Sequence, residues 1–206
     1  MAFGGAAAVT GYGPPERRRE KRVCPRQKNR KERIVIARQT LIYEGRIITV
    51  SREVVQLPNG RTGEFEIVRH PGGAAAVALD RDARVCVLRQ YRHVVADWVW
   101  ELPAGKLDGA EAPLAAAQRE LGEEAGVSAR SWQPLGRMLS SPGVFSETIH
   151  LFLARDLESR SSAPEEHELI EIHWLPLTEA VTRSLSGDIQ DAKTVIGLLR
   201  AQAAVS

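Results

Sequence analysis

The chain has 206 residues, of which 43% are hydrophobic, and this length suits one domain with a sizeable core rather than two. The formal net charge is only +2. No apolar run approaches the ~20 residues that span a bilayer, and no basic segment precedes a signal-like apolar core, so we expect a soluble cytoplasmic protein that binds no membrane.

Positive charge is concentrated in residues 16–33, which hold ten basic residues against three acidic ones. A glycine- and alanine-rich stretch precedes them, and neither part has apolar periodicity. We therefore predict a disordered basic extension over residues 1–33 and a folded domain over residues 34–206. A transit peptide would contain serine, which residues 1–33 lack. Nucleic-acid binding is not expected, because no aromatic side chains interleave the basic ones.

The folded part begins with short β-branched runs that are separated by turn residues. Pro58, Asn59 and Gly60 predict a hairpin turn, so the first strands should be antiparallel. Cys86 lies in an apolar run, where a buried, reduced thiol is expected. The strands predicted before the middle of the chain cover residues 40–43, 46–56, 63–70, 74–79, 85–90 and 98–102.

A helix is predicted between Pro113, which suits a first helical turn, and Gly126, which suits the position just past the last. At helical spacing one apolar stripe contains Leu114, Ala117, Leu121 and Ala125. Further strands are predicted over residues 132–140, 147–154 and 169–174, and helices over residues 178–185 and 192–203. Together these elements predict an α/β sandwich with a mixed sheet.

Glu120, Glu123 and Glu124 project from a neighbouring face of the predicted helix, three and four residues apart. Like charges at this spacing repel, and a bound cation would offset the repulsion. Because all the ligands would be oxygens, Mg²⁺ is expected, with Mn²⁺ as an alternative. Arg119 lies one turn before Glu123 and can orient that carboxylate. The alternative interpretation is an amphipathic surface helix with solvated glutamates.

The wider stretch decides between these interpretations. Gly105, Glu111 and the run from Arg119 to Val127, RELGEEAGV, occupy every fixed position of the Nudix box. The chain thus resembles the Nudix hydrolases. The resemblance implies a Nudix-type α/β/α sandwich with a mixed sheet, preceded by a small antiparallel N-terminal sheet. It also implies metal-assisted cleavage of a nucleoside diphosphate that is linked to another moiety.

Flanking residues indicate a branch of that family. Glu101-Leu102-Pro103-Ala104-Gly105, Gln90-Tyr91-Arg92 and Ser141-Pro142-Gly143 resemble the ADP-ribose pyrophosphatases, and the similarity covers roughly residues 38–202. The implied reaction is hydrolysis of ADP-ribose to AMP and ribose 5-phosphate. The implied metal ligands are the Ala104 carbonyl, Glu120, Glu124 and Glu168. The implied substrate-binding residues are Arg69, Arg92, Glu101 and Pro142.

In this branch the catalytic base tends to come from a loop outside the box. Glu166, in the acidic segment 163–168, is therefore the first candidate for the base, and Glu147 is the alternative. Arg119 and Glu123 complete the expected catalytic set. The resemblance also implies a homodimer in which strands of residues 38–70 reach across to the partner's pocket.

Other functions stay open at this point. Val144 and Phe145 follow Ser141-Pro142-Gly143 where many relatives have small polar residues, so the pocket could take another nucleoside diphosphate sugar or a dinucleotide. Some Nudix domains sense nucleotide sugars without cleaving them, but those usually lack box carboxylates, which are all present here.

Overall fold

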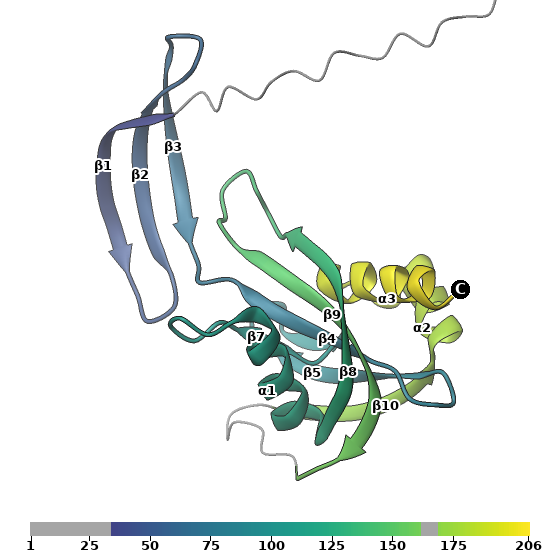
Figure 1. The fold of residues 1–206 in the computed structure, drawn as a ribbon. Helices are drawn as coiled ribbons and strands as arrows, with labels where there is room; N and C mark the ends of the chain where they lie inside the picture. The colour runs from purple at the N-terminus through teal and green to yellow at the C-terminus, as the bar shows by residue number, and fades with distance from the viewer. Residues whose placement is uncertain (1–33, 162–168) are drawn as a thin grey trace, which may run out of the picture. The chain divides into compact units, whose positions relative to one another are not determined.

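The computed structural model describes residues 34–161 and 169–206. Within these ranges the chain forms ten strands and three helices (Figure 1). The strands are β1 (Val35–Glu44), β2 (Thr49–Gln56), β3 (Thr62–Arg69), β4 (Gly73–Ala78), β5 (Arg84–Arg92), β6 (Asp97–Glu101), β7 (Ala104–Lys106), β8 (Val127–Leu139), β9 (Thr148–Ser159) and β10 (Ile170–Pro176). The helices are α1 (Pro113–Ala125), α2 (Leu177–Ser186) and α3 (Ala192–Val205).

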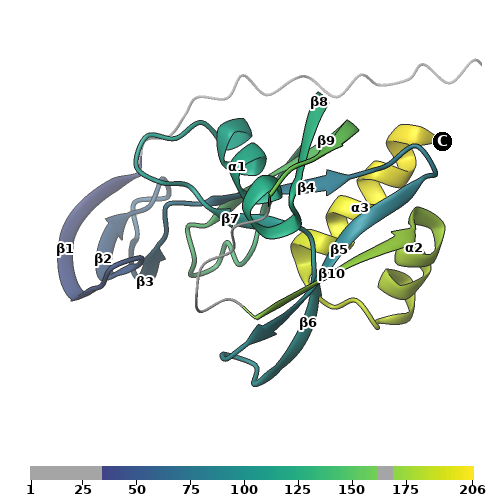
Figure 2. The ribbon, with the colours of Figure 1, turned by 90° about the horizontal axis from the view of Figure 1, so that it is seen from below.

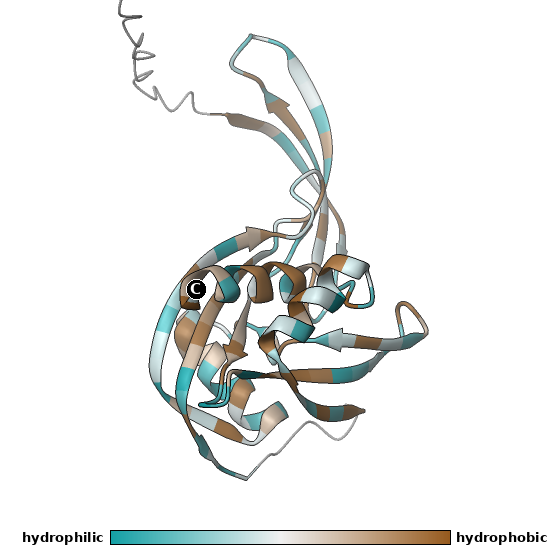
Figure 3. Ribbon diagram, turned by 90° about the vertical axis from the view of Figure 1, so that its right-hand side faces the viewer, coloured by the Kyte–Doolittle hydropathy of each residue, from teal (hydrophilic) through white to brown (hydrophobic). Residues whose placement is uncertain are grey.

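The N-terminal sheet has the order β1-β2-β3 and is antiparallel, as predicted. Its second hairpin turns at Gly60, which has a left-handed φ of 79° that suits glycine. The Gly60 amide donates to the Leu57 carbonyl at 2.9 Å. Apolar and polar residues are mixed along all three strands (Figure 3).

The remaining strands form two sheets, which Figure 2 shows from below. One has the order β7-β4-β9-β8 and is mixed, because β4 and β9 run parallel while the other pairs are antiparallel. The other has the order β10-β5-β6 and is antiparallel. Strand β7 was not predicted from the sequence, since three residues carry no readable alternation.

Strand β4 divides the core between the helices. Its alanine and valine side chains are fully buried, and from Ala75 onward they alternate between two apolar clusters. Ala75 and Val77, together with Leu79 just after the strand, pack in one cluster with residues of α2 and α3, among them Leu198. Ala76 and Ala78 pack in another with Leu121 and Ala125 of α1. Helices therefore cover both faces of this strand, and the α/β/α sandwich is confirmed.

Helix α1 begins at Pro113 and is capped by Gly126, both as predicted. Gly126 has a φ of 64°, and its amide donates to the Gly122 carbonyl at 3.2 Å. The predicted apolar stripe is correct at three positions, but Leu114 in the first turn is 37% exposed, while Ala116 is fully buried. Ala74 of β4 and Ala116 and Ala117 of α1 pack together in a third buried cluster.

Candidate active site

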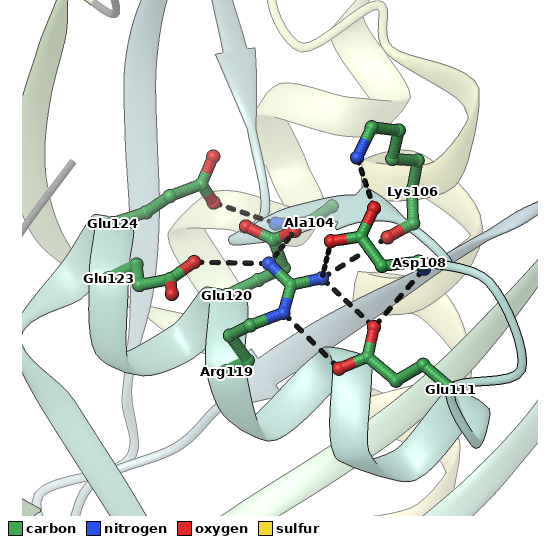
Figure 4. Close-up of polar contacts among 8 residues, drawn as sticks. All are labelled: Ala104, Lys106, Asp108, Glu111, Arg119, Glu120, Glu123 and Glu124. Carbon is green, nitrogen blue, oxygen red and sulfur yellow. Dashed lines mark hydrogen bonds and ion pairs between the residues drawn. The ribbon is translucent and has the colours of Figure 1, made fainter. Parts of the chain in front are cut away.

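Arg119 is the centre of a polar cluster between α1 and β7 (Figure 4). Its Nε and Nη2 donate to the two carboxylate oxygens of Glu111 at 3.2 and 3.0 Å. Its Nη1 donates to Glu120 at 2.7 Å and to Glu123 at 3.1 Å. The hydrogen bonds to Glu111, followed by those to Glu120, raise the pKa of the Arg119 guanidinium above its ordinary value. The predicted contact between Arg119 and Glu123 is present.

Glu124 and Glu120 both lie against the backbone of β7 (Figure 4). Glu124 is only 4% exposed, and its Oε2 accepts a hydrogen bond from the Ala104 amide at 2.8 Å. A Cβ at Gly105 would stand 1.8 Å from Glu120 Oε1, so only glycine lets the carboxylate approach this closely. The structure therefore brings together three of the four predicted metal ligands: Ala104, Glu120 and Glu124.

The donor chemistry at this point fits a hard divalent cation, because carboxylate and carbonyl oxygens are its preferred ligands. In the described ranges, no three histidine, cysteine, aspartate or glutamate side chains come close enough to form a complete metal cage. Mg²⁺ commonly binds through one or two carboxylates and keeps several waters, so a partial protein shell suits it. Glu168, the fourth predicted ligand, and Glu166, the first candidate for the base, lie outside the described residues.

A second charged cluster is centred on Glu101 at the end of β6. Glu101 is 3% exposed and accepts hydrogen bonds from Arg92 Nε at 2.6 Å, Arg92 Nη2 at 2.8 Å and Lys193 Nζ. Burial alone would raise the pKa of this carboxyl, but the Arg92 hydrogen bonds and the Lys193 charge lower it to about 2. Lys193 also lies 3.1 Å from Asp191, the N-cap residue of α3.

Glu147 lies directly before β9, beside His70. Its Oε1 is 3.4 Å from His70 Nδ1, which also accepts a hydrogen bond from the Gly72 amide at 3.1 Å. The segment before Glu147 is tied to β3, because the Val68 amide donates to the Val144 carbonyl and the Ser146 amide donates to the Val68 carbonyl. The N-terminal sheet thus fixes the backbone that carries Glu147.

The Arg119 cluster, the Glu101 cluster and Glu147 lie around one cleft of about 1030 Å³. Six of the predicted site residues line it: Arg92, Ala104, Arg119, Glu120, Glu123 and Glu147. Sequence reasoning missed other lining residues, among them Arg46, His70, Asp191 and Lys193. The N-cap signal of Asp191 could have located the start of α3, but nothing local to Lys193 indicates that it would reach a glutamate 92 positions earlier.

Four predicted residues in the described ranges are not part of the cleft lining. Glu101 and Glu124 are buried behind it and bond to residues that line it. Pro142 is exposed. Arg69, at the end of β3, instead donates to the buried carboxylate of Glu53 at 2.6 Å.

The model of the NUDIX domain matches residues 69–196, and the model of the nucleoside diphosphate sugar hydrolase N-terminal domain matches residues 38–68. The chain is 37% identical over 159 residues to the methanol dehydrogenase activator of Bacillus methanolicus, covering 76% of this chain and 86% of that protein. It is also 37% identical over 171 residues to the ADP-ribose pyrophosphatase of Mycobacterium tuberculosis, covering 82% of each.

A search of solved structures agrees with these matches at the level of the fold. A crystal structure of an ADP compounds hydrolase matches with a TM-score of 0.72 and 24% identity, covering 84% of this chain and 94% of that one. No helix in the described part of the chain is long and apolar enough to cross a membrane. The NUDIX match covers more than half of the chain, including the carboxylates of α1 and the glycine of β7. The chain therefore belongs to the NUDIX family of hydrolases.

Proposed function

We propose that this protein hydrolyses the pyrophosphate bond of ADP-ribose, with water, to AMP and ribose 5-phosphate. The main support for this reaction is that an acidic cluster on α1 and a cationic cluster at Arg92 and Lys193 line the same cleft. A diphosphate needs both, since oxygen ligands hold its cation and guanidinium or ammonium groups bind its oxygens. The similarity to an ADP-ribose pyrophosphatase supports the choice of substrate.

In this proposal the Ala104 carbonyl, Glu120 and Glu124 hold Mg²⁺, with Mn²⁺ as an alternative and Glu168 as a further ligand. When bound, the cation neutralises the diphosphate and increases the acidity of the attacking water. Arg119 keeps Glu120 and Glu123 in place through the hydrogen bonds described above. Glu166 removes the proton of the water, and Glu147, which lines the cleft, is the alternative base.

Substrate contacts are proposed for Arg92, whose guanidinium Glu101 orients, and for Arg69 and Pro142. Arg92 lines the cleft and carries a planar fork of donors that matches two phosphate oxygens. Arg69 is not among the residues that line the cleft of its own chain, so we assign its substrate contact to the cleft of a second copy. We accordingly propose a cytoplasmic homodimer in which the N-terminal sheet of one subunit helps to build the pocket of the other.

The dimer proposal has a second support in the surface of β1. Five apolar side chains on this strand are about half exposed: Val35, Ile36, Leu41, Ile42 and Tyr43. Such a group of apolar side chains on a soluble domain commonly marks a contact surface. A homodimer would cover it by repeating the same contact on both subunits.

Release of nucleoside monophosphate from a panel of nucleotides, with Mg²⁺ present, tests the choice of substrate. We expect the largest kcat/KM with ADP-ribose, followed by other nucleoside diphosphate sugars and dinucleotides. Turnover of nucleoside triphosphates equal to that of ADP-ribose would contradict the choice of substrate. Tight binding of a nucleotide sugar with no product would instead favour the non-catalytic sensing alternative.

A further inference from the structure

Glu53 is a buried acidic residue of the N-terminal sheet that has no assigned role. It lies in β2 and is 2% exposed. Its Oε1 accepts three hydrogen bonds, from Arg69 Nη2 at 2.6 Å, Gln39 Nε2 at 3.2 Å and Ser51 Oγ at 3.2 Å. Gln39 belongs to β1 and Arg69 to β3, so donors from all three strands of the sheet meet at this carboxylate.

A buried carboxylate is costly unless a cation and hydrogen-bond donors compensate its charge. Arg69 supplies the cation, and the 2.6 Å contact with Glu53 is in the range of strong charge-assisted hydrogen bonds. Yet the Arg69 side chain is 48% exposed, because only one of its nitrogens points at Glu53. One nitrogen of the guanidinium is therefore held by Glu53, while about half of the side chain stays exposed to a ligand.

A second arginine–glutamate pair on the same sheet differs from the Arg69–Glu53 pair in the burial of its glutamate. Arg52 is also 48% exposed and lies 3.2 Å from Glu64, but that glutamate is 53% exposed. An exposed pair of this kind leaves both side chains free to move and contributes little to stability. The Glu53 carboxylate is instead held by the sheet, so it restricts Arg69 to a small range of positions.

We infer that Glu53 is a positioning residue that orients the Arg69 guanidinium for the oxygens of a nucleoside diphosphate. The inference rests on the proposed function, in which Arg69 contacts the substrate. A free arginine side chain loses rotamer entropy when it binds a ligand, whereas one that is already held loses less. Glu53 thereby contributes to substrate affinity without touching the substrate.

The test compares steady-state kinetics of the full-length protein with ADP-ribose for five proteins: wild type, Glu53→Gln, Arg69→Ala, the double variant and the control Glu64→Gln. Removing the charge of Glu53 should raise KM by about tenfold and leave kcat nearly unchanged, because uniform binding is lost. Arg69→Ala should raise KM at least as much. The double variant should match Arg69→Ala, since Glu53 acts through Arg69. Glu64→Gln should behave as wild type.

Melting temperature and oligomeric state are measured alongside, because Glu53 is buried. If Glu53→Gln does not fold, Glu53→Asp replaces it: the charge stays, the carboxylate is one methylene shorter, and a rise in KM is again expected. Wild-type KM in the folded Glu53 variant overturns the inference, and so does a full additive effect in the double variant. A silent Arg69→Ala overturns it too, since Glu53 then has no substrate-binding group to orient.

Failure of the proposed function can be distinguished from failure of the inference about Glu53. In that case wild type itself releases no AMP from ADP-ribose. The same five proteins are then compared for binding of ADP by calorimetry, where the inference predicts a weaker Kd for Glu53→Gln and no further weakening in the double variant. Equal Kd values for wild type and Glu53→Gln would overturn it.

Discussion

Arg119 forms more of the polar contacts in the candidate active site than any other side chain drawn in Figure 4. Its guanidinium lies between Glu111, Glu120 and Glu123, so the repulsion expected between neighbouring carboxylates of α1 is largely offset by the protein itself. Glu124 is held separately, by the Ala104 amide. The carboxylates are thus fixed in place before a cation binds.

Glu120→Gln and Glu124→Gln should each keep the fold and lose most of the activity. The amide has nearly the shape of the carboxylate, but it lacks the charge that would hold the metal. We expect kcat at saturating Mg²⁺ to fall by roughly 10²-fold or more, with the far-ultraviolet circular dichroism spectrum unchanged. Glu158→Gln, which changes an exposed glutamate of β9, serves as the control. Near wild-type kcat in both variants would show that the metal ligands are assigned wrongly.

Acid should remove the stabilising effect of Glu101. Its pKa is about 2 in the folded protein and near 4.5 otherwise, so its contribution is complete above pH 4.5 and is lost as pH falls toward 2. Glu101→Gln should therefore lower the free energy of unfolding at pH 6, on the order of 3 kcal/mol. Urea denaturation of both proteins at a series of pH values measures the difference. It should shrink below pH 4.5, and a difference that stays constant to pH 2.5 would contradict this account.

At the residue scale, the sequence predicted the groups that lie within one helix and its flanking loop. Glu120, Glu124, Arg119 and Ala104 are within 21 positions of one another, and their spacing determines how they meet. Lys193 and Glu53 could not be predicted in this way. Each meets its partner only because distant strands and helices pack together, and no local pattern encodes that packing.

At the scale of elements, strands and helices with clear periodicity or caps were predicted well. Helix α1 has its predicted bounds because proline and glycine mark both ends. The ends of other elements differ from the prediction for physical reasons. Strand β1 begins at Val35, before the predicted residue 40, since pairing with β2 continues to Gln56. Strand β8 begins at Val127, directly after the helix cap, because it pairs with β9 as far as Ser159.

The segment of residues 162–168 lies outside the described residues, so the identity of the base is a matter for kinetics. If Glu166 is the base, Glu166→Gln should lower kcat by roughly 10²–10⁴-fold while metal binding stays intact. Glu147→Gln should then have a smaller effect, mainly on KM. Single-turnover rates with ADP-ribose separate the two cases. A nearly silent Glu166→Gln together with an inactive Glu147→Gln would assign the base to Glu147.

At the scale of the whole molecule, the proposed homodimer rests on the position of Arg69 and on the exposed apolar side chains of β1. Light scattering coupled to size exclusion should give about twice the 22.7 kDa mass of the chain. Leu41→Asp, which places a charge at an exposed position of β1, should dissociate the dimer and reduce activity together. Full activity of a monomeric species would refute the proposed shared pocket.

In the proposed reaction, the two charged clusters of the cleft act together on a metal-bound diphosphate. Phosphorus NMR can follow the reaction of ADP-ribose with Mg²⁺ present and after a chelator has removed the cation. We predict equimolar AMP and ribose 5-phosphate with Mg²⁺ and no product without it. Product formation that continues in the chelator, or release of inorganic phosphate in place of these two products, would show that the reaction differs from the proposed one.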